Sequence, residues 1–369
     1  MGLSKIRLGD YIERSTINNR DLMYGTDLIV GVNSDGVFAA PKGNTDGVDL
    51  KPYKIVRNGA FVYNPTRLEL GSIAYRTDGL CIVSHLYIVF YLTEEGRKQI
   101  DPMWLYIYVR RAEFCREVTF RNFGSQRPEF NFSDMSEIVI PLPDIEIQRK
   151  YVAVYQAMLE NQKSYARGLA DLKLVCDAYI EDLRRNMPCE AIGKYVHPYN
   201  VKNTEGEITL EQGINIEKKF ITPQRSNDNF YGRKIVKTGH IAYCTQLNNE
   251  NVAIALRTGA DCIVSGVYDV IELNEGNKIL PSYLMLWLVR SEFGRFVYWA
   301  SQGTSYEFLT YDNLANYQIP VPGIDLQRAI ADIYEVYLER KEINEKLKAQ
   351  IKAICPVLIK GSIEEAERA

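Results

Sequence analysis

The chain has 369 residues, of which 46% are hydrophobic and 11% aromatic, so it is long enough for two or three globular domains, each with its own core. A formal charge of −3 excludes a broadly basic protein, so any nucleic-acid contact must come from local clusters. No apolar stretch reaches the roughly 20 residues that span a bilayer. The N-terminal sequence MGLSKIRLGD has no hydrophobic signal region, so we expect a cytoplasmic protein without membrane contact. The seven cysteines include no CxxC pair, which argues against a zinc site or a disulfide framework.

Most of the chain consists of an internal sequence repeat with a spacing near 180 residues, which predicts two domains of the same architecture. The matching segments are LGDYI at 8–12 and IGKYV at 192–196, KIVRNGAFVY at 54–63 and KIVKTGHIAY at 234–243, CIVS at 81–84 and 262–265, LYIYVRRAEFCREV at 105–118 and LMLWLVRSEFGRFV at 284–297, and IPLPDIEIQR at 140–149 and IPVPGIDLQR at 319–328.

Each copy begins with strand-like sequence. Segments 54–56, 61–63, 73–75 and 81–91 are short, β-branched or aromatic, and separated by turn residues. The later segments 105–118 and 284–297 have helical spacing and mix apolar with basic residues. Segments 32–47 and 199–229 are rich in Gly, Asn and Asp, share least between the copies and give no assignment. These features predict an α+β protein with mostly β domains.

Each IPxP segment predicts an extended stretch that leads into a long helix. The prolines bias the residues before them away from helical geometry. Asp144 then stands where a helix N-cap belongs, and Gly323 takes that place in the second copy. Gln148 and Gln327 recur at the two helix starts, where we expect each to tie the preceding loop to its helix.

The first long helix carries a mostly apolar stripe whose spacings alternate between three and four without a break, which predicts a seam for a facing helix. Its members are Gln148, Tyr151, Tyr155, Met158, Gln162, Tyr165, Leu169, Leu172, Cys176, Tyr179 and Leu183. In the second helix the polar residues Lys341, Asn344 and Lys348 interrupt the seam, and a neighbouring stripe, Ile343, Leu347 and Ile351, takes over. Helices of about 40 residues, ~60 Å long, favour packing on each other. The alternative is that each lies alone on its own domain.

Pro356 should kink or end the second helix. We therefore expect residues 361–369 to form a charged, frayed tail.

The chemistry-bearing motifs are few. The sequence contains no GxG and no GxxxxGK[ST], which excludes the simplest nucleotide-binding loops. The three histidines, His85, His197 and His240, are scattered along the chain and do not suggest a metal cluster or a catalytic triad. We expect no catalytic residues, no cofactor and no metal site.

The two-copy layout and the paired IPxP-Gln-helix signature, preceded by GSQRPEFNFSDM and SQGTSYEFLTYDNL, resemble the specificity (S) subunit of type I restriction-modification systems. The resemblance covers nearly the whole chain. It implies a tandem repeat of two mostly β target-recognition domains, each followed by a long helix, with the helices packed as an antiparallel coiled coil. The implied division is recognition domains at 1–139 and 188–318, helical regions at 140–187 and 319–363, and a tail at 364–369.

The resemblance also implies partners. Each recognition domain would read one half of a bipartite, asymmetric site in double-stranded DNA. The coiled coil would set the unread spacer and dock the methyltransferase (M) subunits, of which we expect two. Restriction/translocase (R) subunits would join through the M–S complex, and this chain itself would not be an enzyme.

Candidate DNA contacts are polar and basic clusters, because arginine can bind phosphate or guanine and glutamine can bind adenine. They are Arg111, Arg116, Arg121, Ser125, Gln126 and Arg127 in the first copy, Arg290, Arg295, Ser301, Gln302, Thr304 and Ser305 in the second, and Arg225, Arg233, Lys234 and Lys237 as a further cluster. The structural alternative is that the repeated arginines form ion pairs with Glu113 and Glu292 or only coat a helix.

Two other functions stay open at this point. One is a similar specificity chain that serves a single fused nuclease-methyltransferase, which only the partner's identity would distinguish. The other is an adaptor that uses its coiled coil without binding DNA.

Overall fold

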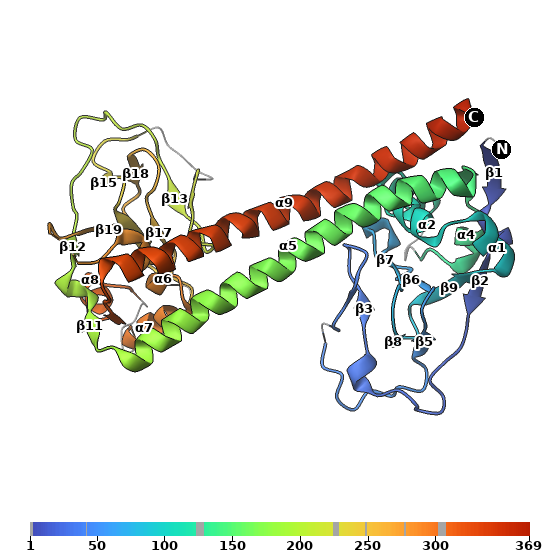
Figure 1. Cartoon of the computed structure of the whole chain (residues 1–369), viewed down its shortest axis with the longest axis horizontal. Coiled ribbons are helices and arrows are strands. Elements are labelled where there is room, and N and C mark those ends of the chain that lie inside the picture. Colours follow the sequence, from blue (N-terminus) through green and yellow to red (C-terminus); the bar gives the residue numbers. More distant parts are fainter. Residues whose placement is uncertain are drawn as a thin grey trace. The chain divides into compact units, whose positions relative to one another are not determined.

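The computed structural model describes residues 3–41, 43–122, 129–223, 229–247, 249–276, 278–301 and 308–369 (Figure 1). The chain divides into unit 1, Met1–Ser164 with Asn344–Ala369, and unit 2, Tyr165–Ile343. Two long helices, α5 (Ile145–Asn186) and α9 (Ile324–Arg368), contribute one part to each unit. Each unit therefore combines one copy of the repeat with segments of both long helices.

Unit 1 is built on a four-stranded antiparallel sheet in the order β2-β9-β6-β7. Its strands are β2 (Ile12–Ser15), β9 (Ile88–Leu92), β6 (Phe61–Tyr63) and β7 (Ile73–Tyr75). Two-stranded pairs accompany it: β1 (Ser4–Arg7) with β10 (Val139–Leu142), β3 (Gly31–Val32) with β4 (Phe38–Ala39), and β5 (Lys54–Val56) with β8 (Cys81–Val83). Its short helices are α1 (Glu94–Gln99), α2 (Pro102–Val109), α3 (Ala112–Arg121) and α4 (Phe132–Ser136).

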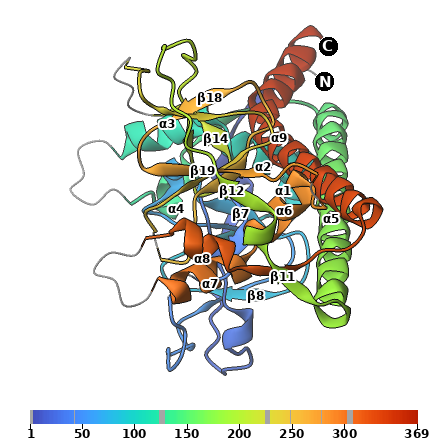
Figure 2. The same ribbon diagram turned by 90° about the vertical axis from the view of Figure 1, so that its left-hand side faces the viewer.

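Unit 2 repeats this plan strand for strand. Its sheet has the order β12-β19-β16-β17, made of Val196–Pro198, Tyr268–Leu273, Ile241–Cys244 and Ile254–Leu256. The pairs are β11 (Cys189–Ala191) with β20 (Gln318–Pro320), β13 (Gly213–Ile214) with β14 (Phe220–Ile221), and β15 (Lys234–Val236) with β18 (Cys262–Val264). Its short helices are α6 (Pro281–Leu288), α7 (Ser291–Ala300) and α8 (Tyr311–Ala315). Helix α7 packs against α8 (Figure 2).

The strands predicted at 54–56, 61–63 and 73–75 are confirmed. The predicted strand segment 81–91 is divided into β8 and β9, which belong to different sheets. The helical segments 105–118 and 284–297 are likewise each split in two. The break falls at Arg110–Arg111 and at Val289–Arg290. Arg111 and Arg290 both have extended backbone, with ψ near 150°, and so begin the second helix of each pair rather than continue the first. The helical spacing of the sequence runs across this break, so spacing alone could not locate it.

The two stretches that gave no assignment contain equivalent hairpins. In unit 1, Gly31 pairs with Ala39 and Val32 with Phe38. In unit 2, Gly213 pairs with Ile221 and Ile214 with Phe220. The sequences GVNSDGVFA and GINIEKKFI therefore form the same hairpin with the same register, and the similarity between the copies extends into segments where we expected least of it.

The predicted role of the repeated glutamine is confirmed in both units. The buried Gln148 side chain accepts a hydrogen bond from the Asp101 amide at 2.9 Å and donates to the carbonyls of Gln99 and Pro143. Gln327 likewise accepts from the Leu280 amide at 2.9 Å and donates to the carbonyls of Lys278 and Pro322. One side chain thus joins the start of each long helix to the loop before α2 or α6.

Within each unit the two long helices run antiparallel and also cover their own globular core. In unit 1, Lys150 of α5 pairs with Glu365 of α9 at 2.8 Å, and Gln162 with Asn344 at 3.0 Å. The same α9 segment places Ile351, Cys355 and Ile359 in the core of unit 1. In unit 2, α5 contributes Ile180 and Leu183 to the core, and α9 contributes Ile330. Packing on each other and packing on the domain are therefore both present.

The predicted seam of α5 holds except at Tyr179, which is exposed while its neighbour Ile180 is buried. Asn344, expected to interrupt the second seam, is only 4% exposed and bonds across to Gln162. Lys341 and Lys348 do point to solvent.

The expected tail at 361–369 is wrong, because α9 continues through Pro356 to Arg368. A proline inside a helix removes one backbone hydrogen bond and crowds the preceding turn. Burial of Leu358, Ile359, Ser362 and Ala366 beyond it offsets that cost. Trp104 donates from its indole to Ser362 at 3.1 Å, which fixes the last turns of the helix to α2.

Candidate nucleic-acid interface

Seven of the predicted DNA contacts lie outside the described residues. They are Ser125, Gln126, Arg127, Arg225, Gln302, Thr304 and Ser305. The other nine lie on α3, at α7, and on or beside β15.

Helix α3 carries three of the predicted arginines in different settings. Arg111 is half-buried at the helix start, where its guanidinium lies 3.8 Å from the centre of the Tyr108 ring. Arg116 pairs with Glu113 at 3.2 Å and Arg121 with Glu117 at 3.0 Å, both on the surface. Exposed ion pairs of this kind contribute little to stability, so Arg116 and Arg121 can exchange their carboxylate partners for a phosphate.

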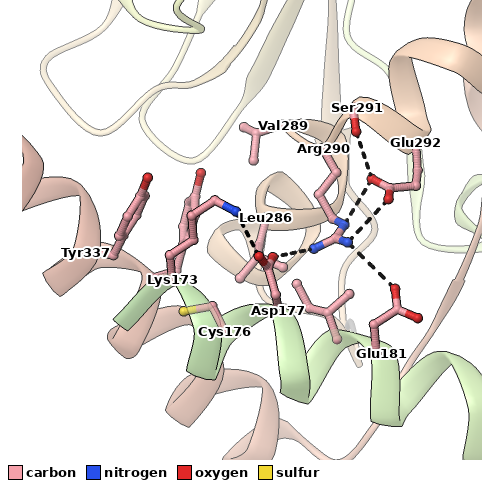
Figure 3. Close-up of a pocket in the computed structure, with 12 residues that line it drawn as sticks. Lys173, Cys176, Asp177, Glu181, Leu286, Val289, Arg290, Ser291, Glu292 and Tyr337 are labelled. Atoms are coloured by element: carbon pink, nitrogen blue, oxygen red, sulfur yellow. Dashed lines mark hydrogen bonds and ion pairs between the residues drawn. The ribbon is translucent and has the colours of Figure 1, made fainter. Parts of the chain in front are cut away.

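Arg290, the counterpart of Arg111, has a different role. Its side chain is 15% exposed and contacts Asp177 at 3.1 Å, Glu292 at 3.3 Å and Glu181 at 3.9 Å. Asp177 and Glu181 come from α5, so the guanidinium joins the start of α7 to the long helix within unit 2 (Figure 3). Arg290 is therefore occupied by internal ion pairs, and we do not retain it as a direct DNA contact.

These groups line a cavity of about 500 Å³ in unit 2, bounded by α5, the α6–α7 junction and α9 (Figure 3). Burial raises the pKa of Asp177, but a hydrogen bond and charge from Lys173, together with Arg290, outweigh it and lower the pKa below its ordinary value. The carboxylate is therefore ionised and fully engaged by two cations. The arrangement is that of a structural ion-pair network.

The other two predicted contacts at α7, Arg295 and Ser301, differ in exposure. Arg295 is exposed and reaches Glu292 at 3.7 Å, so it matches Arg116 and can contact a ligand. Ser301 is 2% exposed, and its hydroxyl donates to the Tyr298 carbonyl at 2.9 Å. The serine thus closes the end of α7 and faces the interior.

The basic cluster around β15 is held by acidic and aromatic neighbours. Arg233 pairs with Glu211, and Lys234 pairs with Asp269. Lys237 lies 5.8 Å from the centre of the Tyr199 ring. In this cluster, Arg233 and Lys234 are largely buried against their partners, which favours a structural role.

Two of the histidines that look scattered in the sequence meet in unit 2. His197 Nε2 lies 2.9 Å from one oxygen of Glu272, and His240 Nε2 lies 3.3 Å from the other. Strand pairing of β12 with β19 brings His197 opposite Glu272, which no sequence spacing reveals. In the described part of the chain, no three His, Cys, Asp or Glu side chains are grouped so as to hold a metal ion.

The equivalent hairpins differ in how they meet the helix beside them. In unit 2, Lys218 has a left-handed backbone (φ 63°), and its Nζ donates to the Leu288 carbonyl at 3.1 Å, at the end of α6. Burial lowers the pKa of this amine to about 8. In unit 1 the equivalent position is Gly36 (φ 71°), and a Cβ placed there would lie 1.4 Å from Nη1 of Arg110. The guanidinium that follows α2 therefore fills the space that a side chain at position 36 would need.

No helix in the described ranges is long and apolar enough to cross a bilayer.

Comparison with known proteins gives a family and a fold. A family model described as "Type I restriction modification DNA specificity domain" matches residues 6–166 and 199–353. The solved structure of the type I restriction-modification system S subunit from M. genitalium is 14% identical, covers 98% of this chain and 96% of its own, and has a TM-score of 0.60. An HsdS subunit structure from Thermoanaerobacter tengcongensis is 18% identical, with coverages of 98% and 96% and a TM-score of 0.42. No curated protein matches the sequence.

Proposed function

Because the chain belongs to the type I restriction modification DNA specificity domain family and is a specificity (S) subunit, we propose that it selects a bipartite DNA target. Unit 1 reads one half-site and unit 2 the other. The long helices dock two methyltransferase subunits and set the length of the unread spacer. Restriction/translocase subunits join through the M–S complex, which acts in the cytoplasm, and this chain contributes recognition without catalysis.

The observation that carries this proposal is that two units share one strand order and register while their exposed side chains differ. The family matches at 6–166 and 199–353 fall on these two copies. Equal frameworks suit two half-sites of one duplex, since backbone geometry repeats at both. Different surfaces, such as Val139 where unit 2 has Gln318, both exposed, suit an asymmetric base sequence.

The direct test is single-molecule sequencing of methylated bases in the host, with and without this gene. We expect the deletion to remove one split, asymmetric methylated motif, and complementation to restore it. Unchanged methylation, in a host whose partner methyltransferase is active, would refute a specificity role and favour the adaptor alternative.

The contact surface has its own test. A triple variant in which Arg116, Arg121 and Arg295 are each changed to methionine should abolish DNA binding by the M–S complex without affecting its assembly. In single-arginine variants that still bind, each lost phosphate contact should reduce the log–log slope of affinity against salt concentration by about one. Replacing Arg149 and Arg328 by methionine, at exposed ion pairs of the helix starts, provides a control that removes two positive charges, to be compared with the double variant of Arg116 and Arg295. Binding that survives with an unchanged salt slope would remove these three arginines from the interface.

A further inference from the structure

A large aromatic ring is exposed at the same place in both units. Phe120 is 82% exposed in the last turn of α3, and Trp299 is 72% exposed in the last turn of α7. The two positions are 179 residues apart, which is also the spacing of Leu105 and Leu284 in the repeat. Phe and Trp are normally buried to a large extent, so an exposed ring kept at equivalent positions suggests a ligand that covers it.

An exposed arginine precedes each ring by four residues, one helical turn away on the same face. These are Arg116 in α3 and Arg295 in α7. Each arginine contacts a glutamate three residues earlier, at 3.2 Å and 3.7 Å. Because such surface pairs are weak, an incoming phosphate can take the place of the glutamate.

The two units must read different bases if the target is asymmetric, so side chains retained in both suit what the two half-sites have in common. Phosphates and sugars are the same at every base pair and fix the register of a protein on the duplex. Apolar rings can pack against deoxyribose or wedge against a base step, and aromatic stacking on bases is tolerant of sequence. An arginine followed by an aromatic ring combines both kinds of contact.

We propose that Arg116 with Phe120, and Arg295 with Trp299, are matched, sequence-independent DNA clamps. In each, the guanidinium binds a phosphate and the ring packs on the adjacent sugar and base edge. This inference rests on the proposed function. DNA is favoured over a protein partner because the arginine complements phosphate charge.

Hydroxyl-radical footprinting with mass spectrometry can identify the occupant in the assembled complex. Three samples are compared: this chain alone, the M–S complex, and the M–S complex bound to the duplex that carries the methylated motif. We expect oxidation of Phe120 and Trp299 to fall several-fold when the duplex is added, and not on addition of the methyltransferase alone. Tyr231, an exposed ring of unit 2, and the buried Trp104 and Trp287 serve as internal references. Protection by the methyltransferase alone would make this a protein interface and overturn the proposal, as would an absence of protection in a complex that binds its target.

Substitutions then separate a clamp from a base-reading contact. Phe120→Ala and Trp299→Ala should each weaken binding of the cognate duplex and of a scrambled duplex by about the same factor, roughly tenfold, and Trp299→Phe should restore most of it. Leu70→Ala and Tyr231→Ala, at other exposed apolar positions, should leave affinity unchanged. Loss confined to the cognate duplex would overturn the clamp. A complex without any preferred target would instead refute the proposed function itself.

Discussion

The Gln162 amide of α5 donates a hydrogen bond to the Asn344 side chain of α9 at 3.0 Å, at the end of the helix seam of unit 1. Asn344 is almost fully buried. A single buried polar pair in an apolar seam fixes helix register at some cost in stability, because any shifted pairing leaves both amides unsatisfied.

A double-mutant cycle measures this pair. Asn344→Leu alone should lower the free energy of unfolding by about 1 kcal/mol, because it removes the partner of Gln162. Changing both residues to leucine should recover that loss or exceed it, giving a coupling energy of about 1 kcal/mol in urea unfolding. The exposed neighbour pair Lys348–Glu345 supplies the control, with coupling below about 0.5 kcal/mol. Additive effects at 162 and 344 would show that the hydrogen bond does not form.

We expect substitution of Gln148 to lower the free energy of unfolding far more than its position at a helix start suggests. Gln148→Met conserves volume but leaves the Asp101 amide and the carbonyls of Gln99 and Pro143 without this partner. The unfolding free energy should drop by about 3 kcal/mol, as each unsatisfied buried group costs about 1 kcal/mol or more. Denaturant unfolding checks this. The adjacent Arg149→Met, at an exposed ion pair, should change it by less than about 1 kcal/mol, and equal effects of the two changes would contradict the structure.

Substitutions of Arg290 and Arg295 should have different effects, the first on stability and the second on DNA binding. Arg290→Met leaves Asp177, Glu181 and Glu292 without their shared cation, so we expect a loss of about 3 kcal/mol in unfolding free energy. Arg295→Met, at an exposed pair, should stay within about 1 kcal/mol and instead weaken DNA binding by the M–S complex. Unfolding and binding measured on both variants decide the assignment, which fails if Arg290→Met is as stable as the wild type.

Lys218 makes the stability of unit 2 depend on pH. Its folded pKa, about 8, lies below the ordinary lysine value of 10.5, so between these values the unfolded chain binds more protons than the folded one. Stability therefore rises with pH across this window, by up to about 1.4 kcal/mol per unit. The gain should be absent in Lys218→Met and present in Lys219→Met, whose side chain is exposed. Parallel pH profiles for wild type and Lys218→Met would refute the shift.

The repeat in the sequence predicts most of the framework, because strand and helix segments are fixed by local apolar patterns that occur twice. Gln148 and Gln327 could be assigned a linking role since they recur at helix starts. The polar hairpins could not be found this way, because they are held by backbone pairing and by contacts with distant residues such as Leu288. The sequence does not predict the helix beyond Pro356 for a related reason, since tertiary burial there overrides a local propensity.

For the candidate DNA-binding residues too, the sequence predicts equivalent positions but not the contacts that the side chains make. Sequence can place Arg111 and Arg290 at equivalent positions, yet one packs on Tyr108 and the other on acids of α5. That difference arises from which side chains a long helix brings alongside, so it cannot be read from the local sequence. Phe120 and Trp299 illustrate the opposite case. Their matching positions are visible in the repeat, but their solvent exposure is visible only in the structure.

Unit 1 has Gly36 at the hairpin position where unit 2 has Lys218. This difference limits which segments can be exchanged between the two copies. A crossover that moves only the hairpin 213–221 into unit 1 would drive a lysine into the guanidinium of Arg110. The reverse transfer would leave the Leu288 carbonyl without its amine. Viable breakpoints must therefore carry each hairpin together with the helix pair that it meets. Chimeras that exchange whole units should therefore fold more stably than chimeras that exchange the hairpin alone.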